Sequence, residues 1–272
     1  MSTAISPILA EKEKALKDII ASYGALAVAF SGGVDSTYLA DVAAEVLGQN
    51  AHMLLADSPS VPREEFEEAS AFAKTRGWRF TILHTREFDN EEYLKNEEKR
   101  CYHCKSELFR QMSLYARQYG ITAIAHGEIA DDALDATRFG VQAAKEYNAV
   151  APLAQAGLHK EEIRLLSKER GLPTWNKASF ACLASRFPRG RRIDLQEMLT
   201  IERAEQILKK KGFHQYRVRH HGDLCRIEID PADFPKLLES NTRQEILAAL
   251  QRLGYKHITL DLAGYRTGST AL

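Results

Sequence analysis

Residues 25–37 read ALAVAFSGGVDST and join an apolar run to the start of a helix. The run 25–30 is typical of a buried parallel strand, and the helix extends from Asp35 to Leu47. Two glycines between them let the backbone approach a ligand, and the helix N-terminus favours an anion. The alternative is a tight turn capped by Asp35 or Ser36. Walker A and dinucleotide fingerprints are both absent, so the junction predicts a phosphate-binding loop of another kind.

The segments after this junction alternate between strand and helix patterns. Further strands are expected at 51–57, 79–85 and 121–127, with a short fifth within 146–153, and further helices at 8–20, 61–77 and 105–119. Short links between alternating strands and helices imply parallel β-α-β units. The sequence therefore predicts an α/β class with a doubly wound parallel sheet.

A different pattern begins after residue 190. A helix is expected from Asp194 to Lys211, followed by alternating runs at 216–220, 225–230 and 257–262. A chain of 272 residues is long enough for two cores. We therefore expect two domains, residues 1–190 and a smaller α+β domain at 191–272.

The composition indicates which classes of ligand and which cellular compartment to expect. The 37 basic and 37 acidic side chains leave no net charge, which disfavours nucleic acid as a ligand. Neither a leader pattern at the N-terminus nor an apolar run of about 18 residues is visible, so we expect a cytoplasmic protein without a membrane partner. Four cysteines in such a compartment suit a metal or catalysis better than disulfides.

The motif SGGVDS resembles the PP-loop of the ATP pyrophosphatases, which cut ATP between its α and β phosphates and hold the departing pyrophosphate. The resemblance implies ATP and Mg²⁺ as cofactors and adenylation of a substrate oxygen. The loop residues it assigns to ATP are Ser31, Gly32, Gly33, Asp35 and Ser36. Asp35 is also expected among the catalytic residues.

Other strand ends are expected to complete the nucleotide site, because ligands of open α/β sheets lie beyond the carboxyl ends of the strands. Asp57 and Ser58 end the second strand and Gly127 ends the fourth, so they are candidates for adenine and ribose contacts. Asp131 is a candidate for a metal or orienting role. The alternative for Asp131 and Asp132 is that they start a helix.

The cysteines form one pair and two single sites. Cys101 and Cys104 make a C-x-x-C unit, which suits a redox pair, half of a zinc site or part of an iron–sulfur site. Cys182 stands alone in the run FACLASR, where a buried inert thiol is the alternative. We expect Cys225 to be buried and inert.

Four motifs spread over the chain resemble the LarE-type sulfur transferases. They are the loop SGGVDS, LPTWNKASFACLASRFPRG at 172–190, RVRHHGDLCRIEI at 217–229 and ITLDLAGYRTGS at 258–269. That family supplies thiocarboxylate sulfur to the nickel-pincer nucleotide cofactor. The resemblance implies an ATP-dependent sulfur transferase.

The cysteine pattern separates two branches of that family. In one branch a single cysteine gives up its own sulfur, and here Ala181 occupies that position, with Cys182 one residue later. The other branch has three cysteines, and its resemblance implies a [4Fe–4S] cluster on Cys101, Cys104 and Cys182, with one iron left open for sulfide. Zn²⁺ or a thiol mechanism are the alternatives at the same residues.

Charged side chains alternate with apolar ones along the strand at 216–220. Arg217 and Arg219 are expected on one face, where a solvated sheet face is the simplest interpretation. The resemblance instead implies an anionic group on that face, since guanidinium groups suit phosphate and carboxylate. The residues it assigns to the substrate phosphate and carboxylates are Arg186, Arg217, Arg219, Glu228 and Arg266.

These assignments combine into one expected reaction. A carboxylate of a pyridinium mononucleotide attacks the α-phosphate of ATP, pyrophosphate leaves, and sulfur from sulfide or another donor displaces AMP.

A homo-oligomer is expected. The rivals are another PP-loop enzyme, such as a tRNA thiolase or an ammonia-dependent synthetase, and an ATP-binding factor without catalysis.

Overall fold

The computed structural model describes residues 6–134, 139–178 and 181–266. The chain forms two compact units, one of residues 1–90 and 101–180 and one of residues 91–100 and 181–272. The division thus falls before Ala181, whereas we expected it at residue 190. Hydrogen bonds explain the difference, because the Gly190 N–H donates to the Asn96 carbonyl at 3.0 Å and the Arg219 guanidinium donates to the Ser185 carbonyl at 2.8 Å.

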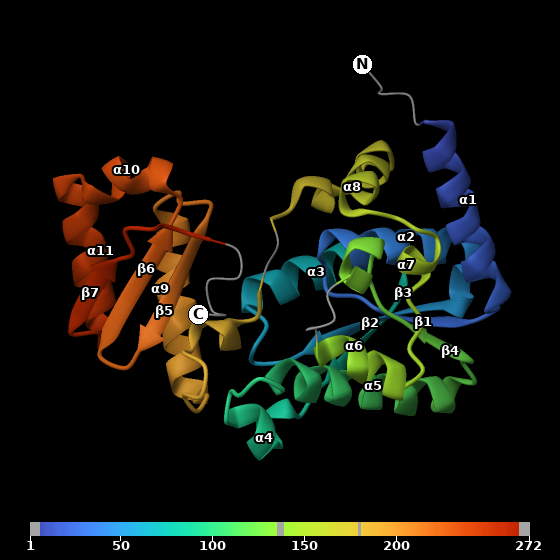
Figure 1. The fold of residues 1–272 in the computed structure, drawn as a ribbon, viewed down its shortest axis with the longest axis horizontal. Helices are drawn as coiled ribbons and strands as arrows, with labels where there is room; N and C mark the ends of the chain where they lie inside the picture. Colours follow the sequence, from blue (N-terminus) through green and yellow to red (C-terminus); the bar gives the residue numbers. More distant parts are fainter. Residues whose placement is uncertain (1–5, 135–138, 179–180, 267–272) are drawn as a thin grey trace. The chain divides into compact units, whose positions relative to one another are not determined.

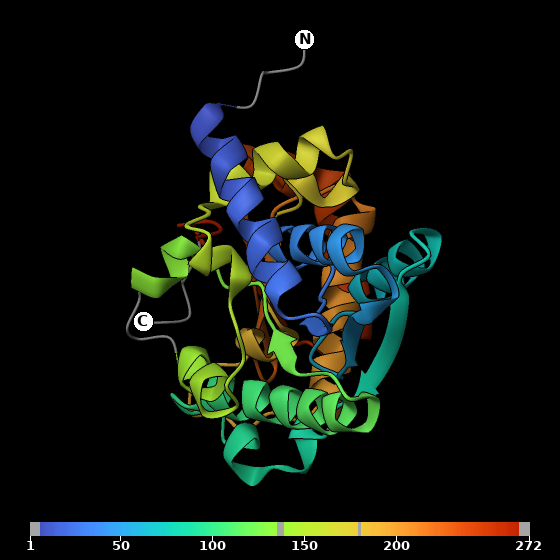
Figure 2. The same ribbon diagram turned by 90° about the vertical axis from the view of Figure 1, so that its right-hand side faces the viewer.

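The first unit is built on a four-stranded parallel sheet of order β3-β2-β1-β4 (Figure 1). The strands are β1 Leu26–Ala29, β2 Ala51–Asp57, β3 Arg79–His84 and β4 Ala123–Ala125. The helices are α1 Pro7–Ser22, α2 Val34–Leu47, α3 Arg63–Thr75, α5 Arg100–Tyr119, α6 Phe139–Glu146, α7 Pro152–Gln155 and α8 Lys160–Glu169. Helices cover both faces of the sheet, and Figure 2 shows β4 between α1 and α5. The predicted doubly wound α/β class is confirmed.

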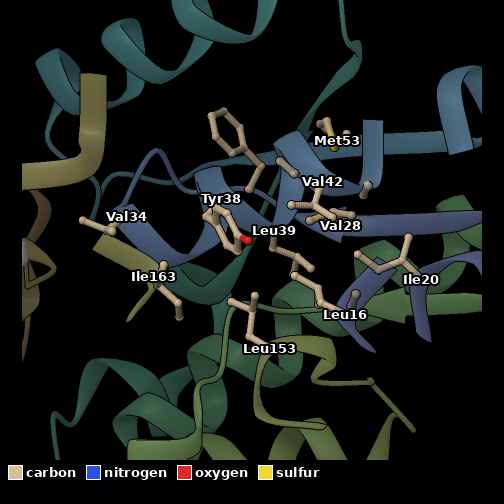
Figure 3. Packing of buried hydrophobic residues seen from close by; sticks show 14 of the residues in the cluster. Leu16, Ile20, Val28, Val34, Tyr38, Leu39, Val42, Met53, Leu153 and Ile163 are labelled. Atoms are coloured by element: carbon tan, nitrogen blue, oxygen red, sulfur yellow. The ribbon is translucent and has the colours of Figure 1, made fainter. Parts of the chain in front are cut away.

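Alternate residues of each strand face two separate cores. On one side Val28 and Met53 pack with Tyr38, Leu39 and the apolar faces of α1, α3, α7 and α8 (Figure 3). On the other side Ala27 and Leu54 pack with α5 and α6. Strands buried on both faces explain why β1 and β2 are continuously apolar. The sheet therefore holds the ends of its strands in fixed positions.

Two elements differ from expectation. The predicted fifth strand is an isolated parallel bridge between Ala125 and Val150, and Pro152 begins helix α7 two residues later. Helix α5 begins at Arg100, five residues before the predicted start, so the C-x-x-C unit lies in its first turns. The Cys-Tyr-His run is a weak helix signal, which concealed this start.

The second unit is an α+β structure whose three strands lie in the order β5-β6-β7. Its strands are β5 Tyr216–His221, β6 Leu224–Ile229 and β7 His257–Leu260, and its helices are α4 Glu91–Leu94, α9 Leu195–Lys210, α10 Phe234–Leu238 and α11 Ser240–Arg252. Asp194 caps α9, its carboxylate accepting the N–H groups of Gln196 and Glu197. The predicted small α+β domain is confirmed. Among the described helices of the chain, none has the length and apolarity needed to cross a membrane.

Candidate active site

The loop between β1 and α2 is folded around the Ser36 hydroxyl. The Ser31 N–H donates to Ser36 Oγ at 3.2 Å, and Ser36 Oγ donates to the Gly33 carbonyl at 3.3 Å. The hydroxyls of Ser31 and Ser36 lie 3.0 Å apart. Gly33 is the N-cap of α2, so the positive end of the helix lies at the loop. This is the geometry expected of an anion-binding loop.

Two glycines are required by close packing around this loop. Gly32 has a φ of +73°, and a Cβ there would lie 2.7 Å from the Cβ of Ala69 on α3. A Cβ at Gly127, beyond the end of β4, would lie 3.1 Å from the Ser36 nitrogen. The loop is thus enclosed by α3 on one side and by the end of β4 on the other.

A cavity of about 300 Å³ lies beside the loop in the first unit. Its apolar wall comes from β1, β2, α5 and Val141 on α6, and includes Leu54, Leu108 and Phe109. Its polar lining is formed by Ser31, Gly33, Asp35, Ser36, Lys105, His126, Gly127, Glu128 and Asp132. Five of the predicted nucleotide residues are in this lining, and Gly32 lies in the same loop. An apolar wall with a few convergent polar groups is typical of a small-molecule site.

Asp35 is held in an ion pair on one side of the loop. Both of its carboxylate oxygens accept from Lys160 Nζ, at 2.8 and 2.7 Å. Asp131, a further predicted site residue, accepts from the Lys160 N–H and pairs with His159 Nδ1, each at 2.8 Å. The hydrogen bond with His159 lowers the pKa of Asp131. Asp131 therefore fixes the start of α8, from which Lys160 reaches Asp35.

Lys105 and His126 were missed by the sequence analysis. His126 is 7% exposed, and its burial, together with the charge of Lys105, lowers its pKa to about 4. The Lys105 side chain passes over Gly140, where a Cβ would lie 2.7 Å from Lys105 Cδ. Lys105 directly follows the C-x-x-C unit, so helix α5 carries both the two thiols and a wall of the cavity.

Asp57 and Ser58 lie at the end of β2 but are engaged with neighbouring residues of the first unit. Asp57 pairs with Arg63 at 2.5 Å and with His84 at 3.2 Å. The buried Ser58 hydroxyl lies 2.7 Å from that of Ser60 and donates to Glu87. Neither predicted residue is in the cavity lining, whereas Ala56 and Val61 are.

The cysteines are divided between the units. Cys101 is exposed and Cys104 half-buried on α5, while Cys182, also half-buried, precedes the 3-10 helix η5 (Leu183–Arg186) of the second unit. Cys225 is fully buried as predicted, and burial raises its pKa to about 12. Within each unit, the described residues contain no group of three His, Cys, Asp or Glu side chains arranged for a metal ion.

The charged face of β5 is buried rather than solvated. Arg219 makes a bidentate pair with Glu228, both bonds at 2.9 Å, and these two predicted substrate residues are 6% and 1% exposed. Arg217 lies over the Tyr265 ring at 4.9 Å, and burial and the charge of Arg186 lower its pKa. Arg266 is exposed. The alternative interpretation, a solvated sheet face, is therefore ruled out for Arg217 and Arg219, while their assignment to an anionic group stays a prediction.

Arg186 is fully buried in the same unit. It makes a bidentate pair with Glu205, at 2.8 and 2.9 Å, and donates to the carbonyls of Ala181 and Cys182 at 2.7 and 3.1 Å. The backbone around Cys182 is therefore fixed by a guanidinium group. Sequence patterns gave no sign of this contact.

Comparison with known proteins agrees with this geometry. The model of the NAD synthase family matches residues 8–215, which include the loop and the cavity. A strand–SGGVDS–helix loop at a cavity of this kind, together with that match, makes the chain a PP-loop enzyme of the ATP pyrophosphatase class.

Three relatives match nearly the whole chain. An uncharacterised protein of Synechocystis sp. is 39% identical over 261 residues, 96% of this chain and 97% of that protein. Pyridinium-3,5-bisthiocarboxylic acid mononucleotide synthase of Lactiplantibacillus plantarum is 33% identical over 262 residues, 96% of this chain and 94% of that enzyme. An uncharacterised protein of Methanocaldococcus jannaschii is 26% identical over 240 residues, 88% of this chain and 90% of that protein. Within its class, the chain belongs to the LarE-type family of sulfur-transferring enzymes, as predicted.

Proposed function

We propose that the enzyme uses ATP to adenylate a carboxylate of a pyridinium dicarboxylic acid mononucleotide and replaces the adenylate with sulfur, for synthesis of a nickel-pincer cofactor in the cytoplasm. The observation that carries this proposal is the SGGVDS loop beside a cavity in a chain 33% identical to a pyridinium-3,5-bisthiocarboxylic acid mononucleotide synthase. The product named for that relative supports this substrate class and sulfur transfer to its carboxylates.

The first step takes place at the loop. The loop from Ser31 to Ser36 binds the phosphates of ATP at the N-terminus of α2. The apolar wall beside Leu54 suits the base, and the lack of a Cβ at Gly127 lets the end of β4 pack closely against the loop. The substrate carboxylate attacks the α-phosphorus, so that an acyl-adenylate forms and pyrophosphate leaves.

Mg²⁺ fits the donors of this cavity, because hard carboxylate oxygens are its preferred ligands. Asp35, Glu128 and Asp132 contribute three carboxylates to the lining. One or two of them, together with the phosphates of ATP, would hold the ion, which would neutralise phosphate charge. Lys160 shares the Asp35 carboxylate, so the ion and the ammonium group compete for it.

The anionic substrate is assigned to the arginines of the second unit. Arg217 and Arg266 supply positive charge, while Arg186 and Arg219, paired with Glu205 and Glu228, keep the surrounding backbone in place. Guanidinium groups are suited to a phosphate and two carboxylates.

A [4Fe–4S] cluster fits the thiolate donors Cys101, Cys104 and Cys182, which would hold it, and it would supply sulfide as the sulfur nucleophile. Cys101 and Cys104 are three residues apart on α5 and so share one helical face. Arg100, which directly precedes Cys101, donates to the Ala184 carbonyl at 3.1 Å within the second unit. Zn²⁺ at the same thiolates is the alternative.

The experiment measures AMP and pyrophosphate release with Mg·ATP and pyridinium-3,5-dicarboxylic acid mononucleotide, with and without sulfide. We expect both products only with this substrate, and a thiocarboxylate only when sulfur is supplied. In parallel reactions ammonia replaces sulfide and tRNA replaces the mononucleotide. An amide formed with ammonia, AMP release with tRNA, or no AMP with the mononucleotide would contradict the proposal.

A further inference from the structure

We propose that Arg186 and Glu205 are positioning residues that hold the backbone of the sulfur-handling cysteine Cys182, and that they do not bind substrate. This inference rests on the proposed sulfur transfer. It concerns contacts that lie within the second unit, and it assigns a role to a buried ion pair that the adenylation step does not use.

The contacts of Arg186 are directed at the cysteine segment. Its Nη1 donates to the Ala181 carbonyl at 2.7 Å, to the Cys182 carbonyl at 3.1 Å and to Ser185 Oγ at 3.0 Å. Its Nε and Nη2 donate to the two oxygens of Glu205 at 2.8 and 2.9 Å. One guanidinium group therefore fixes the residues on both sides of the Cys182 peptide.

Glu205 is itself immobilised by the sheet. Its Oε1 accepts the N–H of Val218, in the middle of β5, at 3.0 Å, and the side chain projects from helix α9. The carboxylate thus links the helix, the sheet and Arg186. We call this ion pair of Arg186 and Glu205 the clamp. Glu205 anchors it to β5, and Arg186 donates to the backbone around Cys182.

Local structure holds this segment only in part. Cys182 precedes a 3-10 helix of four residues, in which the Cys182 carbonyl accepts the Ser185 N–H at 3.0 Å and the Ala184 carbonyl accepts the Phe187 N–H at 3.3 Å. So short a helix leaves much of the segment to be held by side-chain donors. Other guanidinium groups contribute, since Arg219 donates to the Ser185 carbonyl at 2.8 Å and Arg100 to the Ala184 carbonyl at 3.1 Å. Guanidinium groups thus donate to four carbonyls of this segment, those of Ala181, Cys182, Ala184 and Ser185.

Stability alone does not account for such a pair. Burying two charges costs solvation free energy, and an apolar pair of similar volume is often as stable. An apolar pair could not donate to the carbonyls of Ala181 and Cys182. A substrate-binding role is also disfavoured, because the Arg186 side chain is fully buried and directed at protein oxygens.

The test uses the full-length variants Arg186→Lys and Glu205→Gln, with Arg191→Lys as the matched control. Lysine keeps the charge but not the forked donor group. Arg191 pairs with Glu197 at 2.6 Å in the same unit, and none of its hydrogen bonds among the described residues involves residues 181–186. Its variant therefore reports on the loss of an arginine alone.

Two measurements without substrate examine the segment itself. We expect faster hydrogen exchange of peptide 181–187 and on the order of tenfold faster alkylation of Cys182 in Arg186→Lys, with a smaller change in Glu205→Gln. The rest of the second unit should exchange as in the wild type. Unchanged exchange and alkylation in both variants, or an equal change in Arg191→Lys, would overturn the proposal.

A third measurement separates positioning from substrate binding. With the mononucleotide and ATP, we expect an unchanged KM and an unchanged rate of pyrophosphate release, but at least about tenfold less thiocarboxylate per AMP, because a displaced sulfur lets water intercept the acyl-adenylate. A raised KM with full coupling would instead assign Arg186 to the substrate. If the wild-type enzyme released no pyrophosphate, the proposed function would fail, while exchange and alkylation would still decide on the clamp.

Discussion

At the scale of single residues, Gly32 makes the packing around the loop testable. Any other residue at this position would have to adopt the left-handed backbone conformation of Gly32, and its Cβ would collide with the Cβ of Ala69 on α3. Gly32→Ala should destabilise the first unit by about 1–2 kcal/mol through the backbone strain and lower ATP affinity at least tenfold through displacement of the loop. Isothermal titration with a non-hydrolysable ATP analogue measures the affinity.

Two further variants separate strain from contact. Gly24→Ala has a similar φ of +67° but no atom within 4 Å of the new Cβ, so it should lose stability and keep ATP affinity. Ala69→Gly removes the atom that Gly32→Ala meets, so the double variant should recover a large part of the affinity. Equal affinity losses in Gly24→Ala and Gly32→Ala, without recovery in the double variant, would refute the packing explanation.

At the scale of elements, His126 directly follows β4 and packs against the ring of Phe109 on α5, at a centroid distance of 5.5 Å. Its pKa of about 4 in the folded protein lies below the ordinary value of 6.5. Between these two values the unfolded chain binds more protons, so stability falls as the pH falls below 6.5. When the pH falls from 7 to 5, this residue should lower the free energy of unfolding by about 2 kcal/mol.

The variant His126→Gln should lack that part of the pH dependence. Urea unfolding followed by tryptophan fluorescence suits the measurement, since Trp78 and Trp175 both belong to the first unit. The difference in unfolding free energy between pH 7 and pH 5 should be smaller in the variant than in the wild type by about 2 kcal/mol. Parallel pH profiles for the two proteins would show that His126 is not buried in its neutral form.

The elements themselves were largely predictable from sequence, whereas contacts between them were not. Glycine and proline signals and continuous apolar runs located the strands of the first unit, and Asp194 marked the start of α9. The pair Arg219–Glu228 was unpredictable, because alternating charge normally indicates a solvated face. Lys105 and His126 join the cavity only through the packing of α5 and β4, which leaves no local pattern.

At the scale of the whole molecule, the proposed cluster requires thiolates from both units. Cys101 and Cys104 belong to the first unit and Cys182 to the second, whereas Cys225 is buried in the core of the second. A role in sulfur delivery would therefore make the chemistry depend on the two units together. The buried Cys225 offers a control, because its raised pKa keeps it protonated and a poor ligand.

Iron and sulfide analysis after anaerobic purification tests this dependence. Cys101→Ser, Cys104→Ser and Cys182→Ser should each lose most of the iron, while Cys225→Val should retain it, because valine replaces a buried apolar side chain without loss of a ligand. Since the PP-loop lies in the first unit, the Cys182→Ser enzyme should still release pyrophosphate but form no thiocarboxylate. Full iron content in Cys182→Ser would exclude a three-thiolate cluster, and zinc without iron in the wild type would assign the thiolates to a different metal.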